Sequence, residues 1–325
     1  MTLLEIRDLK VYYYAFDGVV KAVDGVSLDI KSGEFFGLIG ESGCGKSTLG
    51  NAILRLVPPP GRVAGGSIYF HGEDILQLPE DRMREIRGDR ISMIFQDPTA
   101  ALDPVYTIGD QIVETILAHN PEVSKKDAEA RAIELLKLVG IPGAEARIHE
   151  YPHQFSGGMR QRAVIAIALA NNPELLIADE PTTNLDVTIE AQILTLLDEL
   201  RRKLNMSILL ITHNIGIVAE YTDRVGVMYA GKLVEVGRTV DVLTDPKHPY
   251  TQGLLGAIPG RGGRKGRVTE IPGTVPNLAN PPPGCRFHPR CPKRFDPCDQ
   301  EEPALVRLPG EGRMVACHLY RGPES

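Results

Sequence analysis

The sequence carries a glycine-rich segment whose residue types and spacing suit phosphate binding. Residues 40–47 read GESGCGKS, match G-x-x-x-x-G-K-[ST] and follow the apolar run Phe35–Ile39. Glycines let successive backbone N–H groups surround phosphate oxygens, and the N-terminus of a following helix attracts the same anions. We expect Lys46 to reach the β- and γ-phosphates of a nucleotide and Ser47 to hold Mg²⁺, a chance match being the alternative. The residues expected at the nucleotide are Gly40, Ser42, Gly43, Cys44, Gly45, Lys46, Ser47 and Thr48.

Two carboxylates follow a second apolar run. Residues 175–178 read LLIA and are followed by Asp179 and Glu180. Burial explains the apolar residues, but an unpaired carboxylate at the end of a buried strand is costly and needs a reason. Asp179 in the Mg²⁺ shell would supply that reason, and Glu180 could polarise the attacking water. Pairing with surface lysine or arginine is the alternative.

A serine and two glycines open a predicted helix before these acids. Ser156, Gly157 and Gly158 precede a largely apolar segment. Serine is a favoured N-cap residue, so a capped helix with flexible glycines would explain the triplet taken alone.

These residues need an α/β scaffold to position them. Apolar runs alternate with helical patterns, which favours a core of parallel strands, and residues 98–172 read as mostly helical. The expected strands are Leu3–Leu9, Val26–Ile30, Glu34–Ile39, Ser67–Phe70, Ile91–Phe95, Leu175–Ala178, Ser207–Ile211, Arg224–Tyr229 and Lys232–Val236. The expected helices are Ser47–Leu56, Ile108–Leu117, Lys125–Val139, Gly158–Ala170, Val187–Leu204 and Ile215–Glu220.

The order of the motifs resembles that of ATP-binding cassette (ABC) ATPases. The phosphate loop, Gln96, the Ser156 triplet, Asp179 with Glu180, and His213 follow one another as in that family. The resemblance covers residues 1 to about 245. It implies a P-loop NTPase fold, with a mixed sheet core, a β subdomain and a helical lobe at about 97–172.

The resemblance also implies roles for individual residues. Gln96 would contact Mg²⁺ and the attacking water, and His213 would hold the γ-phosphate beside the catalytic Glu180. Asp186 fits the D-loop. Tyr13 aligns with the aromatic residue that stacks on adenine, and core packing is its alternative.

Residues 156–158 match the motif known as the signature motif in this family, and that motif acts in trans. They would bind the γ-phosphate held by a partner's phosphate loop, in a head-to-tail dimer that sandwiches two ATP molecules. A lone chain would therefore bind ATP but hydrolyse it poorly. Two residues depart from the family pattern: Asn184 stands where alanine is common, and Asn214 stands where aspartate is usual.

The chain changes character after about residue 246. Nine of its 25 prolines lie between Pro272 and Pro303, and proline removes backbone donors and fixes φ. We expect an irregular segment held by something other than a hydrophobic core. Four cysteines in the spacing C-x5-C-x6-C-x18-C could bind an iron–sulfur cluster or zinc, and free thiols or disulfides are the alternative. These cysteines are Cys285, Cys291, Cys298 and Cys317.

This segment resembles the C-terminal extension of oligopeptide/dipeptide importer ATPases. The resemblance extends over residues 246–325 and favours a [4Fe–4S] cluster over Zn²⁺. It implies an ATPase at the cytoplasmic face of the cell membrane, with a second similar ATPase, two transmembrane permease subunits and an extracytoplasmic substrate-binding protein. An oligosaccharide or nickel is the alternative cargo. A non-transport ABC ATPase is a further alternative, but the short interval between Gln96 and Ser156 leaves no room for the coiled-coil insertion of repair enzymes.

Composition and charge exclude several other classes of protein. The 325 residues are 42% hydrophobic and 24% charged, which is ordinary for a globular protein and excludes a disordered tail or a fibre. The longest apolar run, residues 163–170, is too short to cross a bilayer, and Glu5, Arg7 and Asp8 argue against a secretory signal. A net charge of −6 gives no case for nucleic-acid binding. The basic residues within 261–267 are interpreted as a solvated linker or as a loop near anionic lipid.

Overall fold

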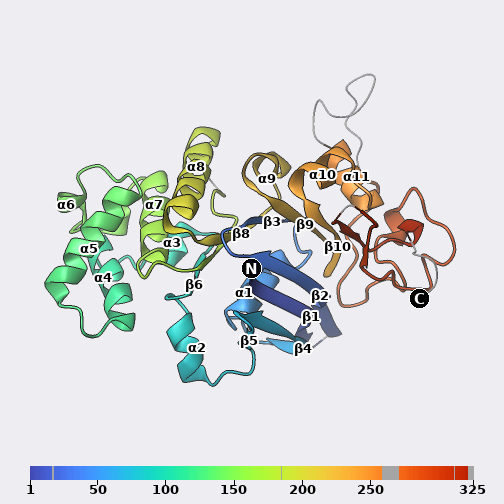
Figure 1. Cartoon of the computed structure of the whole chain (residues 1–325), viewed down its shortest axis with the longest axis horizontal. Helices are drawn as coiled ribbons and strands as arrows, with labels where there is room; N and C mark the ends of the chain where they lie inside the picture. Colours follow the sequence, from blue (N-terminus) through green and yellow to red (C-terminus); the bar gives the residue numbers. More distant parts are fainter. Residues whose placement is uncertain (17, 184, 258–270, 311, 321–325) are drawn as a thin grey trace. The chain divides into compact units, whose positions relative to one another are not determined.

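The structure, a computed structural model, describes residues 1–16, 18–183, 185–257, 271–310 and 312–320 (Figure 1). Asn184 and the basic residues within 261–267 lie outside them. The chain divides into two compact units. The first comprises Met1, Lys31–Phe35 and Gln77–Leu210, and the second comprises Thr2–Ile30, Phe36–Leu76 and Ile211–Ser325.

Buried strands form the core of the first unit. Strand β6 (Ile91–Ile94) pairs in parallel with β7 (Leu175–Asp179), and every residue of both strands is buried. Strand β8 (Ser207–Thr212) is also buried throughout, and its last two residues belong to the second unit. Strands covered on both faces are typical of parallel sheets, so the apolar runs predicted strands correctly.

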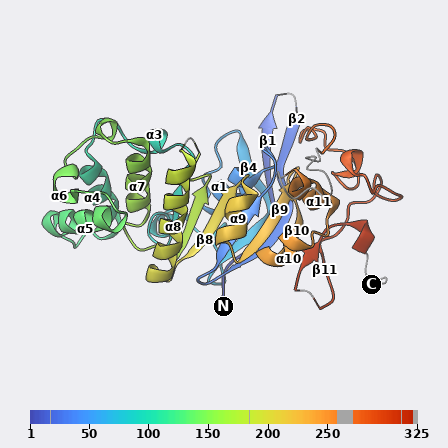
Figure 2. The same ribbon diagram turned by 90° about the horizontal axis from the view of Figure 1, so that it is seen from above.

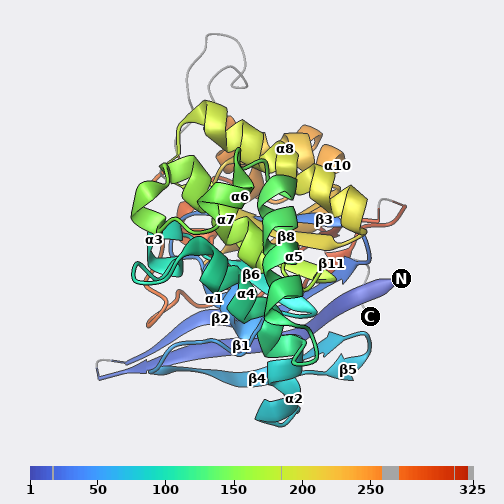
Figure 3. The same ribbon diagram turned by 90° about the vertical axis from the view of Figure 1, so that its left-hand side faces the viewer.

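Helices make up most of the first unit (Figures 1–3). The expected helical lobe contains four α-helices between Thr107 and Leu169, each begun by a residue with non-helical backbone. Thr107 forms a capping box with Asp110, and Ser124 caps the next long helix. The helices are α2 (Glu80–Ile86), α3 (Pro98–Ala101), α4 (Ile108–His119), α5 (Lys125–Leu138), α6 (Ala144–Arg147), α7 (Gly157–Ala168) and α8 (Val187–Leu204), with a 3-10 turn at Pro152–Gln154.

The second unit contains an antiparallel sheet in the order β2-β1-β4-β5. The long strand β1 (Thr2–Ala15) pairs with β4 (Gly61–Phe70) from Leu4 opposite Phe70 to Tyr13 opposite Gly61. Strand β2 (Gly18–Lys31) lies on the other side of β1, and β5 (Glu73–Asp74) pairs with β4. This sheet corresponds to the β subdomain expected from the resemblance.

A mixed set of strands supports the phosphate loop in the same unit. Strand β3 (Phe35–Ile39) runs parallel to β9 (Arg224–Tyr229), which pairs antiparallel with β10 (Lys232–Arg238). The two-residue strands β12 (Met314–Val315) and β11 (Val306–Arg307) extend this order from β10. The helices are α1 (Lys46–Ile53), α9 (Ile215–Tyr221), α10 (Thr239–Thr244) and α11 (Pro249–Gly256), with 3-10 turns at His288–Arg290 and His318–Tyr320.

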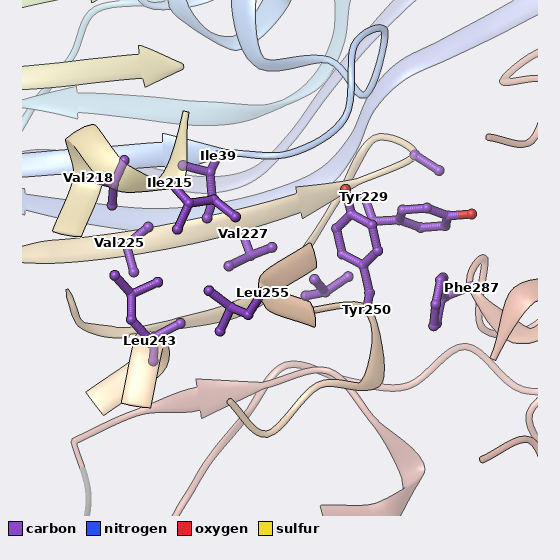
Figure 4. Packing of buried hydrophobic residues seen from close by; sticks show 13 residues of the cluster. Ile39, Ile215, Val218, Val225, Val227, Tyr229, Leu243, Tyr250, Leu255 and Phe287 are labelled. Carbon is purple, nitrogen blue, oxygen red and sulfur yellow. The ribbon is translucent and has the colours of Figure 1, made fainter. Parts of the chain in front are cut away.

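The proline-rich segment is anchored in a hydrophobic core, which corrects the expectation that something else holds it. Phe287 is 2% exposed and belongs to a buried cluster built on β9, α10 and α11. Its ring centroid lies 5.1 Å from that of Tyr229 and 5.4 Å from that of Tyr250, and Figure 4 shows the three rings together. Phe287, with the partly buried Ile271 and Leu278 packed against the same cluster, thus attaches a segment that has few regular elements of its own.

Candidate nucleotide site

The phosphate loop connects β3 to α1 through two glycines that nothing larger could replace. A Cβ on Gly40 would lie 2.2 Å from the Met228 carbonyl oxygen, and a Cβ on Gly45 would lie 2.0 Å from that of Ala22. Gly45 also has a φ of 103°, which side chains rarely adopt. The loop is therefore pressed against the backbone of two neighbouring segments, and its shape is fixed.

Lys46 begins α1 and points back into the loop. Its side chain is buried, and its ammonium group donates to the carbonyls of Gly40 at 2.7 Å and Glu41 at 3.1 Å. Cys44 is also buried; its Sγ lies 3.7 Å from the Lys46 Nζ, and burial raises the pKa of the thiol. A raised pKa favours the neutral form of the Cys44 thiol beside Lys46.

Tyr13 is the member of a tyrosine triplet that lies beside α1. Its hydroxyl is 3.5 Å from the Thr48 Oγ1. The hydroxyl of Tyr12 donates to Asp24 at 2.6 Å, and burial raises its pKa. The ring of Tyr14 stacks under the guanidinium of Arg62. The three neighbours thus have different contacts, and that of Tyr13, the predicted adenine residue, is with α1, the helix that follows the phosphate loop.

The first unit brings Gln96 and Glu180 together. The Gln96 Nε2 donates to the Glu180 Oε2 at 2.9 Å, and the Thr183 hydroxyl donates to the same oxygen at 3.1 Å. Asp179, which ends β7, is 5% exposed. Glu180 has a φ of 46°, a left-handed conformation that costs a side-chain-bearing residue about 1–3 kcal/mol. The strand therefore ends in an abrupt turn that carries both carboxylates.

The signature residues form the first turn of α7. The Ser156 hydroxyl caps the helix by accepting from the Met159 N–H at 3.3 Å. A Cβ on Gly158 would lie 3.0 Å from the Ile189 side chain, and Gly157 lies near Leu185. Asp186 caps α8 by accepting from the Ile189 N–H at 2.9 Å. The predicted signature and D-loop residues thus lie against each other, where the starts of α7 and α8 meet.

His213 lies exposed in the turn between β8 and α9. The next residue, Asn214, caps α9 by accepting from the Gly216 N–H at 3.0 Å. Asparagine and aspartate are comparable N-cap residues, so this departure from the family pattern preserves the local structure after His213.

The predicted four-cysteine metal site is not supported. The four cysteines form no disulfides. Burial raises the pKa of the Cys285 thiol to about 11, and the nearby thiols of the other three cysteines contribute to this increase. Metal ligation needs thiolates, which burial without a metal disfavours. Within the described ranges, no three or more His, Cys, Asp or Glu side chains are arranged to hold a metal ion.

Two residues outside the predicted set contact the phosphate loop. Both guanidinium NH groups of Arg290 donate to the Glu41 carboxylate, and the Tyr250 hydroxyl accepts from the Glu41 N–H. The only signal in the sequence was an acidic residue inside a phosphate-binding motif, which needs a cationic partner, but spacing does not reveal a partner so distant along the chain.

Comparisons with known proteins agree with these features. The model of the ABC transporter family matches residues 23–183, and that of the oligopeptide/dipeptide transporter C-terminal region matches residues 234–298. The dipeptide transport ATP-binding protein DppD of Bacillus subtilis (strain 168) is 51% identical over 318 residues, covering 98% of this chain and 94% of that protein. The oligopeptide transport ATP-binding protein AppD of the same organism is 50% identical over 320 residues, covering 98% and 97%.

Solved structures show the same fold. The dimeric ATP-binding cassette MJ0796, in a post-hydrolysis state bound to ADP and Pi, matches with a TM-score of 0.66 and 29% identity, over 73% of this chain and 99% of that chain. The fold and the nucleotide motifs therefore define an ABC ATPase. More narrowly, the chain belongs to the family of dipeptide and oligopeptide transport ATP-binding proteins, which are transport-coupled ATPases. Across the described residues, none of the helices is both long and apolar enough to cross a bilayer.

Proposed function

We propose that the chain binds MgATP at the phosphate loop and hydrolyses it to drive peptide import. The observation that carries this proposal is the loop itself, where Gly40 and Gly45 touch neighbouring backbone and the buried Lys46 points inward. Such a loop presents backbone N–H groups and one ammonium group to phosphate oxygens. The nucleotide-binding set is Tyr13, Gly40, Ser42, Gly43, Cys44, Gly45, Lys46, Ser47, Thr48, Gln96, Asp179 and Asp186, with Ser156, Gly157 and Gly158 acting on the partner's nucleotide.

The oxygen donors of this set suit Mg²⁺. The Ser47 hydroxyl, the Asp179 carboxylate and the Gln96 amide oxygen would hold it, since Mg²⁺ prefers oxygen ligands. When bound, the ion neutralises charge on the phosphate oxygens. Asp179 fits this role because its carboxylate ends the buried strand β7 directly before Glu180.

Glu180 is the proposed general base and His213 the proposed γ-phosphate contact. The Glu180 carboxylate accepts from Gln96 and Thr183 through Oε2. Those two donors orient the carboxylate, which would accept a proton from water during attack on the γ-phosphate. Gln96 would adjust this orientation when it also contacts Mg²⁺.

Hydrolysis is proposed to need a dimer. The Ser156 turn would complete the nucleotide site of a second cassette, and MJ0796, which shares the fold, is itself dimeric. The proposed assembly contains a second similar ATPase, two transmembrane permeases and an extracytoplasmic binding protein, with this chain at the cytoplasmic face of the membrane. Peptide cargo is supported by the names of the relatives, which are dipeptide or oligopeptide transport proteins.

Glu180→Gln in the assembled transporter tests the proposal. The amide preserves shape but is not basic, so ATP hydrolysis and peptide uptake should fall by about 10²-fold or more while ATP binding persists. Glu199→Gln is the matched control, because Glu199 is exposed on α8. Near-normal turnover by the Glu180 variant would refute its role as the base. Uptake of nickel or oligosaccharide without peptide would refute the cargo.

A division into an ATPase domain at 1–245 and an extension at 246–325 is part of the proposal. We also propose Cys285, Cys291, Cys298 and Cys317 as ligands of a [4Fe–4S] cluster, with Zn²⁺ as the alternative. This part of the proposal rests on the number and spacing of the four cysteines, since the described side chains are not arranged to hold a metal ion. Anaerobically purified protein should contain iron and absorb broadly near 400 nm. Stoichiometric zinc without iron would favour the Zn²⁺ alternative over the cluster, and protein without either metal would refute the metal site.

A further inference from the structure

The C-terminal extension holds one residue of the phosphate loop from two sides. The Arg290 guanidinium donates to both carboxylate oxygens of Glu41, at 2.9 and 3.1 Å. The Tyr250 hydroxyl accepts from the Glu41 backbone N–H at 3.0 Å. A bidentate pair fixes orientation as well as distance. The side chain and the backbone of Glu41 are therefore both tied to residues that follow β10.

Arg290 is itself firmly placed. Its side chain is 6% exposed. Its Nε donates to the Pro272 carbonyl at 2.9 Å, and one NH group is 3.3 Å from the Tyr229 hydroxyl. Its backbone N–H donates to the carbonyl of the buried Phe287 at 3.0 Å. Because these contacts hold the guanidinium, moving Glu41 would break the pair rather than carry Arg290 along.

Glu41 transmits this constraint to the group that is proposed to bind phosphate. Its carbonyl accepts from the Lys46 ammonium at 3.1 Å. One residue thus links three groups: Arg290 at its carboxylate, Tyr250 at its N–H and Lys46 at its carbonyl. A carboxylate in an anion-binding loop also repels phosphate unless it is neutralised, and Arg290 provides the compensating charge.

The C-terminal extension also contacts a second residue, Asp24, near the phosphate loop. Arg286 forms an ion pair with Asp24, which also accepts from the Tyr12 hydroxyl. The Asp24 N–H donates to Gly231, whose own N–H donates to the Cys44 carbonyl at 2.9 Å. The seven residues from Cys285 to Cys291 therefore contact both the loop and the strand that carries Asp24.

We propose that Arg290 and Tyr250 are positioning residues for nucleotide binding, which hold Glu41 neutralised and in place so that the phosphate loop accepts ATP. Neither residue touches the nucleotide. This inference rests on the proposed nucleotide site, and it assigns the extension a direct part in ATP affinity.

The test compares ATP affinity and turnover for full-length variants in the assembled transporter. Arg290→Met leaves the Glu41 carboxylate unpaired, so the KM for MgATP should rise about tenfold, equivalent to about 1.4 kcal/mol, with a smaller change in kcat. Arg290→Lys keeps the charge but loses the bidentate geometry, and its KM should lie between those of the wild type and Arg290→Met. Arg294→Met is the matched control, since Arg294 pairs with Asp299 at an exposed position of the same extension.

The decisive variant combines Arg290→Met with Glu41→Gln. Removal of both charges should return the KM to within about threefold of the wild-type value, because no unpaired carboxylate remains. Tyr250→Phe, which removes only the acceptor for the Glu41 N–H, should raise the KM by a few-fold. A purely structural role predicts the opposite for the double variant, with a KM as high as that of Arg290→Met and a lower unfolding temperature.

A wild-type KM for Arg290→Met, or no recovery in the double variant, would overturn the inference. Lys46→Ala separates this failure from failure of the nucleotide site. Loss of ATP binding in Lys46→Ala, together with a wild-type KM for Arg290→Met, would refute only the positioning role. Full ATP binding by Lys46→Ala would refute the site itself. If Arg290→Met does not fold, Arg290→Lys and Glu41→Gln carry the test through their KM values.

Discussion

Replacement of Phe287 by alanine tests whether the extension shares a core with the strands that support the phosphate loop. Phe287 is 2% exposed and makes edge contacts with two tyrosine rings, at centroid distances of 5.1 and 5.4 Å. Truncation of a buried phenylalanine costs about 3–5 kcal/mol, because contacts are lost and a cavity remains. At about 3 °C per kcal/mol for a unit of this size, the unfolding temperature should fall by roughly 10 °C.

The assay is thermal unfolding followed by circular dichroism, with ATP affinity measured on the same samples. Phe295→Ala is a matched control, because Phe295 is 42% exposed in the same extension. The control should change the unfolding temperature by no more than about 2–3 °C. Equal, small shifts for the two variants would show that the extension is a separate appendage and would refute the shared core. Phe287→Ala should also weaken ATP binding, because the buried ring anchors the start of the 3-10 turn His288–Arg290, which carries Arg290.

Three further substitutions test the loop, the signature helix and a buried histidine. Gly45→Ala places a Cβ 2.0 Å from the Ala22 carbonyl, so ATP binding measured by calorimetry should be lost. Gly158→Ala presses on Ile189 at 3.0 Å and should lower turnover in the assembled transporter roughly tenfold without changing ATP binding by the isolated chain. Burial lowers the pKa of His248 to about 3. Below about pH 6.5 the unfolded chain binds a proton at this residue that the folded chain does not, so the free energy of unfolding should fall by up to about 1.4 kcal/mol per pH unit. His248→Asn should reduce this loss of stability, measured by urea titration at several pH values.

Each of these predictions has a control or a contrary outcome. Gly72 has a φ of 83° and nothing within 4 Å of its Cβ position, so Gly72→Ala should leave ATP binding intact. ATP binding by Gly45→Ala would contradict the close approach of the loop to Ala22. Unchanged turnover in Gly158→Ala would mean that the starts of α7 and α8 can separate freely. A wild-type pH profile in His248→Asn would assign the acid sensitivity to other groups.

Local signals in the sequence predicted elements well where period and caps agreed. Helix α8 begins and ends at the predicted residues, Val187 and Leu204, because an aspartate cap and a regular apolar face mark it. The phosphate loop was recognisable because its glycines are demanded by the backbone itself. Gln96 and Glu180 could be named from motif order, but their hydrogen bond depends on the parallel pairing of β6 and β7.

Features that depend on distant pairing could not be predicted. Strands β11 and β12 have two residues each; β12 pairs with β10, which is distant from it in the sequence, and β11 pairs in turn with β12. The left-handed backbone of Glu180 has no sequence signal, since glutamate does not favour it. The Arg290–Glu41 pair joins residues at opposite ends of the chain. Cysteine spacing, finally, says which thiols could meet but not whether their geometry would suit a metal.

The pairing of β10 with β12 has a practical consequence for work with shortened forms of the protein. Val236 stands opposite Met314, and the Val234 carbonyl accepts from the Ala316 N–H. A fragment that ends at residue 245 would leave the backbone N–H and C=O groups on one edge of β10 without strand partners, beside apolar side chains. Such an exposed edge strand tends to pair with the same edge of another copy. Such fragments should precipitate or self-associate on expression, and their poor behaviour would reflect an uncapped sheet margin rather than any defect in nucleotide chemistry.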